Sequence, residues 1–149
     1  MKNMRALALF SMALVVTLLS CKTKKPVTLD RNETEGLPQA AALQKLRELL
    51  PTAEFVYCTA PKVTLKQAEI STWSIENDAL GLEHGKGNTL KLSFGDISDV
   101  KLDMSGKYFY VKVFTLVQTE REKPHFEFLF RIEDRAKQVG ELLLSLKKK

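Results

Sequence analysis

The hydrophobic period of the chain changes twice, and this change constrains the fold more than any other feature of the sequence. Between residues 54 and 132, apolar and polar residues alternate, most strictly at Phe126, Phe128, Phe130 and Ile132. On both sides of this region, apolar residues recur with helical spacing instead. Alternation places one face of a strand against a core, whereas helical spacing builds a stripe along one side of a helix. The sequence therefore predicts an α+β fold.

Two amphipathic helices are expected, one on each side of the alternating region. The first covers residues 39–50, with a proline at an early helical position and Pro51 at its end. Its apolar stripe consists of Ala42, Leu43, Leu46, Leu49 and Leu50. The second begins at Asp134, which we expect to cap it, and runs to three lysines that suit the negative end of the helix dipole. Its stripe consists of Ala136, Val139, Leu143 and Leu146.

An antiparallel sheet is expected between these helices. The predicted strands cover residues 54–59, 68–75, 79–83, 89–94, 100–104, 108–119 and 126–132. Short polar turns at 76–78, 84–87 and 105–107 join several of them. Because parallel strands need long crossover connections, such turns favour an antiparallel meander.

Two segments carry a resemblance to a known superfold. Segment 88–100 (NTLKLSFGDISDV), and the strand FEFLF at 126–130 running into helix 133–146, resemble the pleckstrin-homology-like superfold with its bacterial and GRAM-type relatives. This resemblance implies a strongly bent antiparallel sheet or barrel of about seven strands, capped by the carboxyl-terminal helix. Helix 39–50 is extra to that pattern, so a cystatin-like helix-on-sheet fold remains the alternative. In either case residues 37–149 form a single globular domain.

A second resemblance lies at the amino terminus. Two basic residues precede an apolar stretch, 6–19, that is too short to span a bilayer comfortably. The run LLSC at 18–21 resembles the lipobox of bacterial lipoproteins, although Leu19 is bulkier than the residue usual there. The resemblance implies that residues 1–20 are a signal peptide and that Cys21 carries diacylglycerol, which anchors the chain to a membrane. An ordinary cleaved signal and an uncleaved anchor are the alternatives.

The polar residues that follow, 21–36, are expected to be a lipidated tether between the membrane and the domain. Within it, Lys22, Lys24 and Lys25 either contact anionic headgroups or are simply solvated. A lysine rather than an aspartate follows Cys21, which favours the outer over the inner membrane by analogy with enterobacterial sorting. We therefore expect a lipid-anchored protein of the bacterial cell envelope.

The charge of the mature chain argues against binding to nucleic acid. Two of the 23 basic residues lie in the predicted signal peptide, so 21 basic and 18 acidic residues remain. The resulting net charge of +3 equals the contribution of the three terminal lysines alone. Basic and acidic residues are also mixed along the chain, whereas a nucleic-acid binder shows a basic face interleaved with stacking aromatics.

No motif for catalysis stands out, so we expect no enzyme, no cofactor and no metal. His84 and His125 have no nucleophile arrangement near them in the sequence. The three aspartates between residues 96 and 103 lack the spacing of a calcium loop. With Cys21 acylated, Cys58 is the only remaining thiol, and we expect it to be buried and inert.

Binding is therefore the expected function. In eukaryotic relatives of the resembled fold, basic residues on the first strand-to-strand loop bind inositol phosphates, and the corresponding loop here holds Lys62 and Lys66. A protein or peptide that adds a strand to an open sheet edge is the other option, with Tyr57, Trp73, Tyr108 and Tyr110 as aromatic anchors. For Trp73, burial in the core is the preferred alternative, because Ile75 shares its face of the strand. The sequence thus predicts a scaffold or binding module for a protein, peptide or lipid. The alternatives are an envelope enzyme whose site assembles only on folding, and a module that binds a small apolar ligand.

The anchor generates a direct prediction. Cys21→Ser removes the acylated sulfur, so the protein is expected to appear in soluble fractions or to keep its signal peptide. Membrane fractionation and mass spectrometry of the amino terminus measure both outcomes. Unchanged membrane association together with normal amino-terminal processing would contradict the lipobox interpretation.

Overall fold

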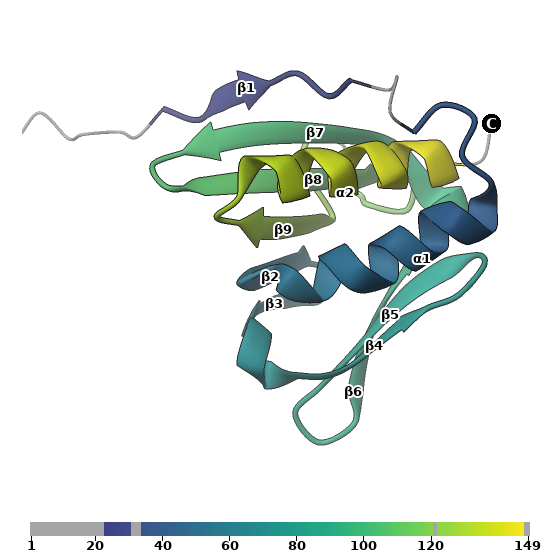
Figure 1. Cartoon of the computed structure of the whole chain (residues 1–149). Coiled ribbons are helices and arrows are strands. Elements are labelled where there is room, and N and C mark those ends of the chain that lie inside the picture. The colour runs from purple at the N-terminus through teal and green to yellow at the C-terminus, as the bar shows by residue number, and fades with distance from the viewer. Residues whose placement is uncertain (1–22, 31–33, 121, 148–149) are drawn as a thin grey trace, which may run out of the picture.

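The computed structural model of the protein describes residues 23–30, 34–120 and 122–147, and it is an α+β structure with two antiparallel sheets (Figure 1). The strands are β1 (Lys25–Val27), β2 (Phe55–Thr59), β3 (Lys62–Lys66), β4 (Ile70–Ile75), β5 (Ala79–His84), β6 (Asn88–Ser93), β7 (Ile97–Ser105), β8 (Tyr108–Thr115) and β9 (Phe126–Phe130). The α-helices are α1 (Gln39–Leu49) and α2 (Glu133–Leu146). Three short 3-10 helices, η2 (Leu50–Thr52), η3 (Gln67–Glu69) and η4 (Phe94–Asp96), link elements.

The larger sheet has six strands in the order β1-β7-β8-β9-β2-β3, and the smaller has three in the order β4-β5-β6. Every strand pair is antiparallel, which confirms the predicted direction of pairing. The strands do not form one continuous meander, because β6 and β7 belong to different sheets and β9 pairs with β2. Strand β9, the last strand in the chain, pairs with both β8 and β2. It therefore brings a late part of the chain next to an early part. The two sheets remain separate among the described residues. Of the expected bent sheet or barrel of about seven strands, no closed barrel forms in this described part of the chain, and the strands divide between two sheets.

The core lies between one face of the large sheet, the small sheet and the two helices. Helix α2 packs across β7, β8 and β9, while α1 packs against α2 and β4. From β9, Phe126, Phe128 and Phe130 enter the core and are at most 1% exposed. The helix predicted at 39–50 is thus confirmed and is part of the core, with Ala42, Leu43 and Leu46 buried.

Three predicted element ends are wrong, and each error has a local cause. The strand predicted to reach residue 119 ends at Thr115, where the chain turns and the Leu116 N–H donates to the Asp96 carbonyl at 2.9 Å. Ile132, expected to continue the buried alternation, is the N-cap of α2 and is 48% exposed. Asp134 lies in the first turn of that helix, where a carboxylate suits the helix dipole without capping it.

Two strands at the edges of the large sheet were not predicted. Strand β3 forms where a loop with Lys62 and Lys66 was expected, and β1 forms inside the expected tether. Beyond β1, the Asp30 N–H donates to a Glu141 carboxylate oxygen at 3.0 Å, and Leu29 packs where the missing side chain of Gly140 leaves room. This part of the expected tether is therefore docked on the domain rather than free. Cys21 and the rest of residues 1–22 lie outside the described residues.

Within the described ranges, neither helix is long and apolar enough to cross a membrane.

The burial of β9 generates a stability prediction. Phe128→Ala removes a fully buried ring and is expected to lower the free energy of unfolding by about 3–5 kcal/mol. The matched control, Leu116→Ala, truncates a side chain that is 71% exposed and should change it by less than about 0.5 kcal/mol. Urea denaturation followed by circular dichroism measures both. Equal changes in the free energy of unfolding for the two variants would contradict the placement of Phe128 in the core.

Candidate functional site

The face of the large sheet that points away from the helices carries an unusual number of aromatic side chains. They are Phe55 and Tyr57 in β2 and Tyr108, Tyr110 and Phe114 in β8, all half-buried. We call these five residues the aromatic face. All three tyrosines of the chain belong to it. Among the described residues, the helices α1 and α2 both lie on the opposite side of this sheet (Figure 1).

Strand register places these side chains together. Val56, Phe128 and Val111 are cross-strand partners, are completely buried and point into the core. The next row, Phe55, Leu129 and Tyr110, must point the other way because successive side chains alternate between the two faces of a strand. Leu129 is only 3% exposed on that open face, since an aromatic side chain flanks it from each neighbouring strand. The aromatic residues therefore form a second, smaller apolar cluster.

Cations surround this cluster. The Lys24 Nζ lies 4.5 Å from the centre of the Tyr110 ring, and the Lys107 Nζ lies 5.5 Å from that of Tyr108. The Arg131 guanidinium carbon lies 5.6 Å from the Tyr108 ring centre. A cation over an aromatic face contributes about 0.5–1 kcal/mol at exposed positions. Similarly, Lys101 Nζ lies 5.1 Å from the centre of Phe114, so the rings meet water through a rim of positive charge.

Two cations on this side of the sheet form ion pairs with carboxylates. Arg131 pairs with Glu54 at 2.6 Å, and Lys112 pairs with Asp103 at 2.5 Å. Hydrogen bonding to the Glu54 carboxylate raises the pKa of Arg131 above its usual range, so the guanidinium keeps its charge.

The phenol of Tyr110 is also affected by this setting. Burial in the aromatic face raises the pKa of Tyr110, and the nearby Tyr57 and the Glu127 carboxylate add to the effect. Lys24 extends over the same strands and lies 3.7 Å from Glu127. Tyr110 therefore stays a neutral hydrogen-bonding group in the pH range where proteins are folded.

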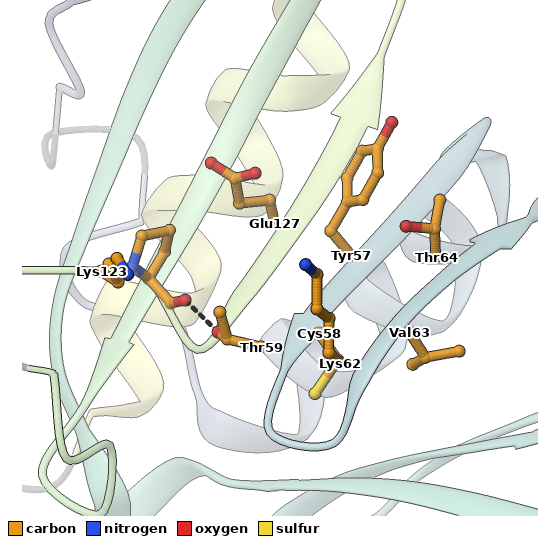
Figure 2. Close-up of a pocket in the computed structure, with 9 residues that line it drawn as sticks. Tyr57, Cys58, Thr59, Lys62, Val63, Thr64, Lys123 and Glu127 are labelled. Atoms are coloured by element: carbon orange, nitrogen blue, oxygen red, sulfur yellow. Dashed lines mark hydrogen bonds between the residues drawn. The ribbon is translucent and has the colours of Figure 1, made fainter.

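A small hollow of about 240 Å³ lies on the same side of the sheet, beside the β2–β3 hairpin. Its labelled side chains come from β2, β3, β9 and the connection before β9 (Figure 2). They are Tyr57, Cys58, Thr59, Lys62, Val63, Thr64, Lys123 and Glu127. The hollow is smaller than the pockets that enclose a drug-sized ligand, so it extends the aromatic face rather than forming a separate chamber.

The structure separates the residues that were expected to act together. Lys62 and Lys66 stand at the two ends of β3, four residues apart, which is about 13 Å along a strand. They therefore lie on a strand, and the expectation that they lie on a loop is wrong. Their contact with a ligand stays a prediction. Trp73 lies in β4 of the other sheet and packs on the main core. Of the aromatic residues predicted as anchors, Tyr57, Tyr108 and Tyr110 lie together on the aromatic face.

The sequence contained a signal for the remaining members of the site. Alternation that buries Phe126, Phe128 and Phe130 implies that the residues between them face outwards. The same argument applied to β2 and β8 would place Phe55 and Phe114 outside. The order of the strands in the sheet depends on pairings between residues that are distant in the sequence, and local patterns do not encode it. The same order determines which lysines reach which rings.

Two of the titratable side chains considered for chemistry, His125 and Cys58, have structural roles. His125 Nε2 lies 3.2 Å from the Ala60 carbonyl and must donate to it, and Nδ1 lies 3.0 Å from the Thr115 hydroxyl. Cys58 is 4% exposed, and burial raises the pKa of its thiol, so little reactive thiolate forms at neutral pH. Among the described residues, no three His, Cys, Asp or Glu side chains gather closely enough to hold a metal ion.

Comparison with known proteins finds no matching family model, no matching curated protein and no matching solved structure.

Proposed function

We propose that this protein is a lipid-anchored, non-enzymatic binding module of the bacterial cell envelope, and that the aromatic face is its contact surface. The observation that carries the proposal is the side-by-side placement of five half-buried aromatic residues on the sheet face opposite the helices. Tyrosine and arginine are enriched where proteins bind partners, because each combines a large contact area with polar groups. Attachment through acylated Cys21, with outer-membrane sorting, supplies the location.

The chemistry of the face supports contact rather than catalysis. Its rings and cations bind through stacking, cation–π contact and burial of apolar area, none of which requires a group to gain or lose a proton. Arg131 and Lys112 are held in ion pairs, and both ring nitrogens of His125 have partners. The ion pairs therefore hold Arg131 and Lys112 in place beside the face.

A pleckstrin-homology-like ancestry is part of the proposal. The meander β7–β8–β9 that runs directly into α2, and the pairing of β9 with β2, support it. Strand β1 and helix α1 are additions to that pattern. In this arrangement the contact surface is the open sheet face, and the loop lysines that serve eukaryotic relatives have no counterpart.

Photo-crosslinking in cells tests the contact surface. A benzophenone amino acid at Tyr57 or Phe114 is expected to form adducts, because both side chains lie on the aromatic face. The matched controls are Thr72 and Lys91, which are exposed on the small sheet. Adduct yields at the two face positions should exceed those at the controls by about fivefold, as contact energy concentrates on aromatic anchors.

Mass spectrometry of the adducts then distinguishes a protein or peptide from a lipid. Equal yields at all four positions, or adducts only at Thr72 and Lys91, would refute the assignment of the surface.

A further inference from the structure

Strand β1 determines which end of the domain lies nearest the anchor. It pairs antiparallel with β7, with Lys25 opposite Met104 and Val27 opposite Leu102. Moving from Lys25 towards the amino terminus therefore leads to the end of the sheet that holds the β7–β8 turn. Cys21 precedes Lys25 by four residues, which span at most about 14 Å when fully extended.

The residues at this end form a distinct group, the anchor-end cluster, which consists of Lys107, Tyr108, Arg131 and Ile132. The start of β1, the β7–β8 turn and the start of α2 lie at one end of the sheet (Figure 1). Tyr108 holds the two cations over its ring. Ile132 is apolar and 48% exposed.

We propose that the anchor-end cluster rests on the anionic phospholipid surface to which Cys21 is attached, and so fixes the orientation of the domain. The inference rests on the acylation of Cys21 in the proposed function. Tyrosine is favoured at membrane interfaces, where its ring is in the headgroup region and its hydroxyl meets water. Lysine and arginine beside it are attracted to anionic headgroups. Ile132 offers an exposed apolar side chain beside these groups.

Nearby carboxylates cancel part of the positive charge of the anchor-end cluster. The contact therefore orients the domain on the membrane but does not by itself bring the domain to the membrane. Arg131 shares its charge with Glu54, and at the start of α2 Glu133 pairs with Lys137 at 2.7 Å. Asp134 adds a further negative charge in the same turn. The surplus of positive charge is small, so the cluster binds weakly by itself and acts because the acyl chains hold it within reach.

The opposite end of β8 then points away from the membrane. Thr115 ends the strand, and the following Leu116 and Val117 are 71% and 61% exposed. From Lys107 to Leu116 is nine residues, or about 30 Å along a strand. The β2–β3 hollow, with Lys62 and Lys123, also lies towards this far end and stays open to partners.

Fluorescence quenching on vesicles tests the orientation with two labelled variants of the full acylated protein. Ser105→Cys carries the fluorophore at the anchor end, and Thr119→Cys carries it at the far end. Buried Cys58 does not compete for the label. In vesicles of equal parts phosphatidylcholine and phosphatidylglycerol, a quencher on the lipid headgroups is expected to reduce Ser105→Cys emission about threefold more than that of Thr119→Cys.

Charge variants test whether the anchor-end cluster, rather than the tether, determines the orientation of the domain. Lys107→Glu with Arg131→Gln should reduce that difference about twofold, as should replacing phosphatidylglycerol with phosphatidylcholine or raising the salt concentration. The matched control, Lys86→Glu with Lys91→Gln, makes the same change of charge on the small sheet and should leave the difference intact.

Two results would overturn the inference. Equal quenching of both labels, or stronger quenching at Thr119→Cys, with Cys21 acylation verified by mass spectrometry, refutes the orientation and leaves the proposed anchoring in place. A Cys21 found without lipid refutes the anchoring itself, and with it the orientation.

Discussion

Strand β9 is hydrogen-bonded on both sides, to β8 and to β2, and this double pairing determines both faces of the large sheet. Its three phenylalanines fill the core against α2, while Glu127 and Leu129 point to the opposite face. Because side chains alternate across a strand, the register that buries Phe128 between Val56 and Val111 also brings Phe55 and Tyr110 together across Leu129. The aromatic face is thus a direct consequence of how the core is built.

An open aromatic face needs protection from self-association, and the surrounding charges provide it. Exposed apolar patches on soluble proteins mark binding surfaces or aggregation sites. Here Lys24, Lys107 and Arg131 lie over tyrosine rings, which keeps each ring half-buried and surrounds it with solvated charge. Lysines at both ends of β3 similarly discourage another sheet from pairing with that edge. A partner that gains access to the face must therefore offer contacts that replace these cations or make use of them.

The sequence predicted the type of most elements because their apolar residues recur with a clear period. Both helices and the strands that cross the core were found within a few residues of their ends. Strands β1 and β3 were missed because each is short, lies at a sheet edge and contains lysine, which is the usual signature of a loop. Ile132, Leu116 and Val117 misled the assignment of strand ends because they are apolar but exposed.

The site was less predictable than the fold. Tyr57, Tyr108 and Tyr110 were selected from their residue type, but Phe55 and Phe114 were not. Lys62 and Lys66 were expected on a loop and lie on β3. Trp73 packs on the core from β4, which was the preferred alternative to its role as an anchor. Proximity of β2 to β8 through β9 depends on a pairing of distant residues that local patterns do not encode. The ring–cation contacts depend on the same register.

One measurement tests the central claim, that the aromatic face is covered by a binding partner in the envelope. Hydroxyl-radical footprinting reports the solvent accessibility of all three tyrosines, with Trp73, the single tryptophan on the other sheet, as an internal reference. Oxidation of Tyr57 and Tyr110 is expected to be weaker in native envelope membranes than in the purified, detergent-solubilised protein, while oxidation of Trp73 stays the same. Tyr108 does not count in this comparison, because contact of the anchor-end cluster with the membrane would protect it without a partner. Equal oxidation of Tyr57 and Tyr110 in both preparations, or protection confined to Trp73, would contradict the account.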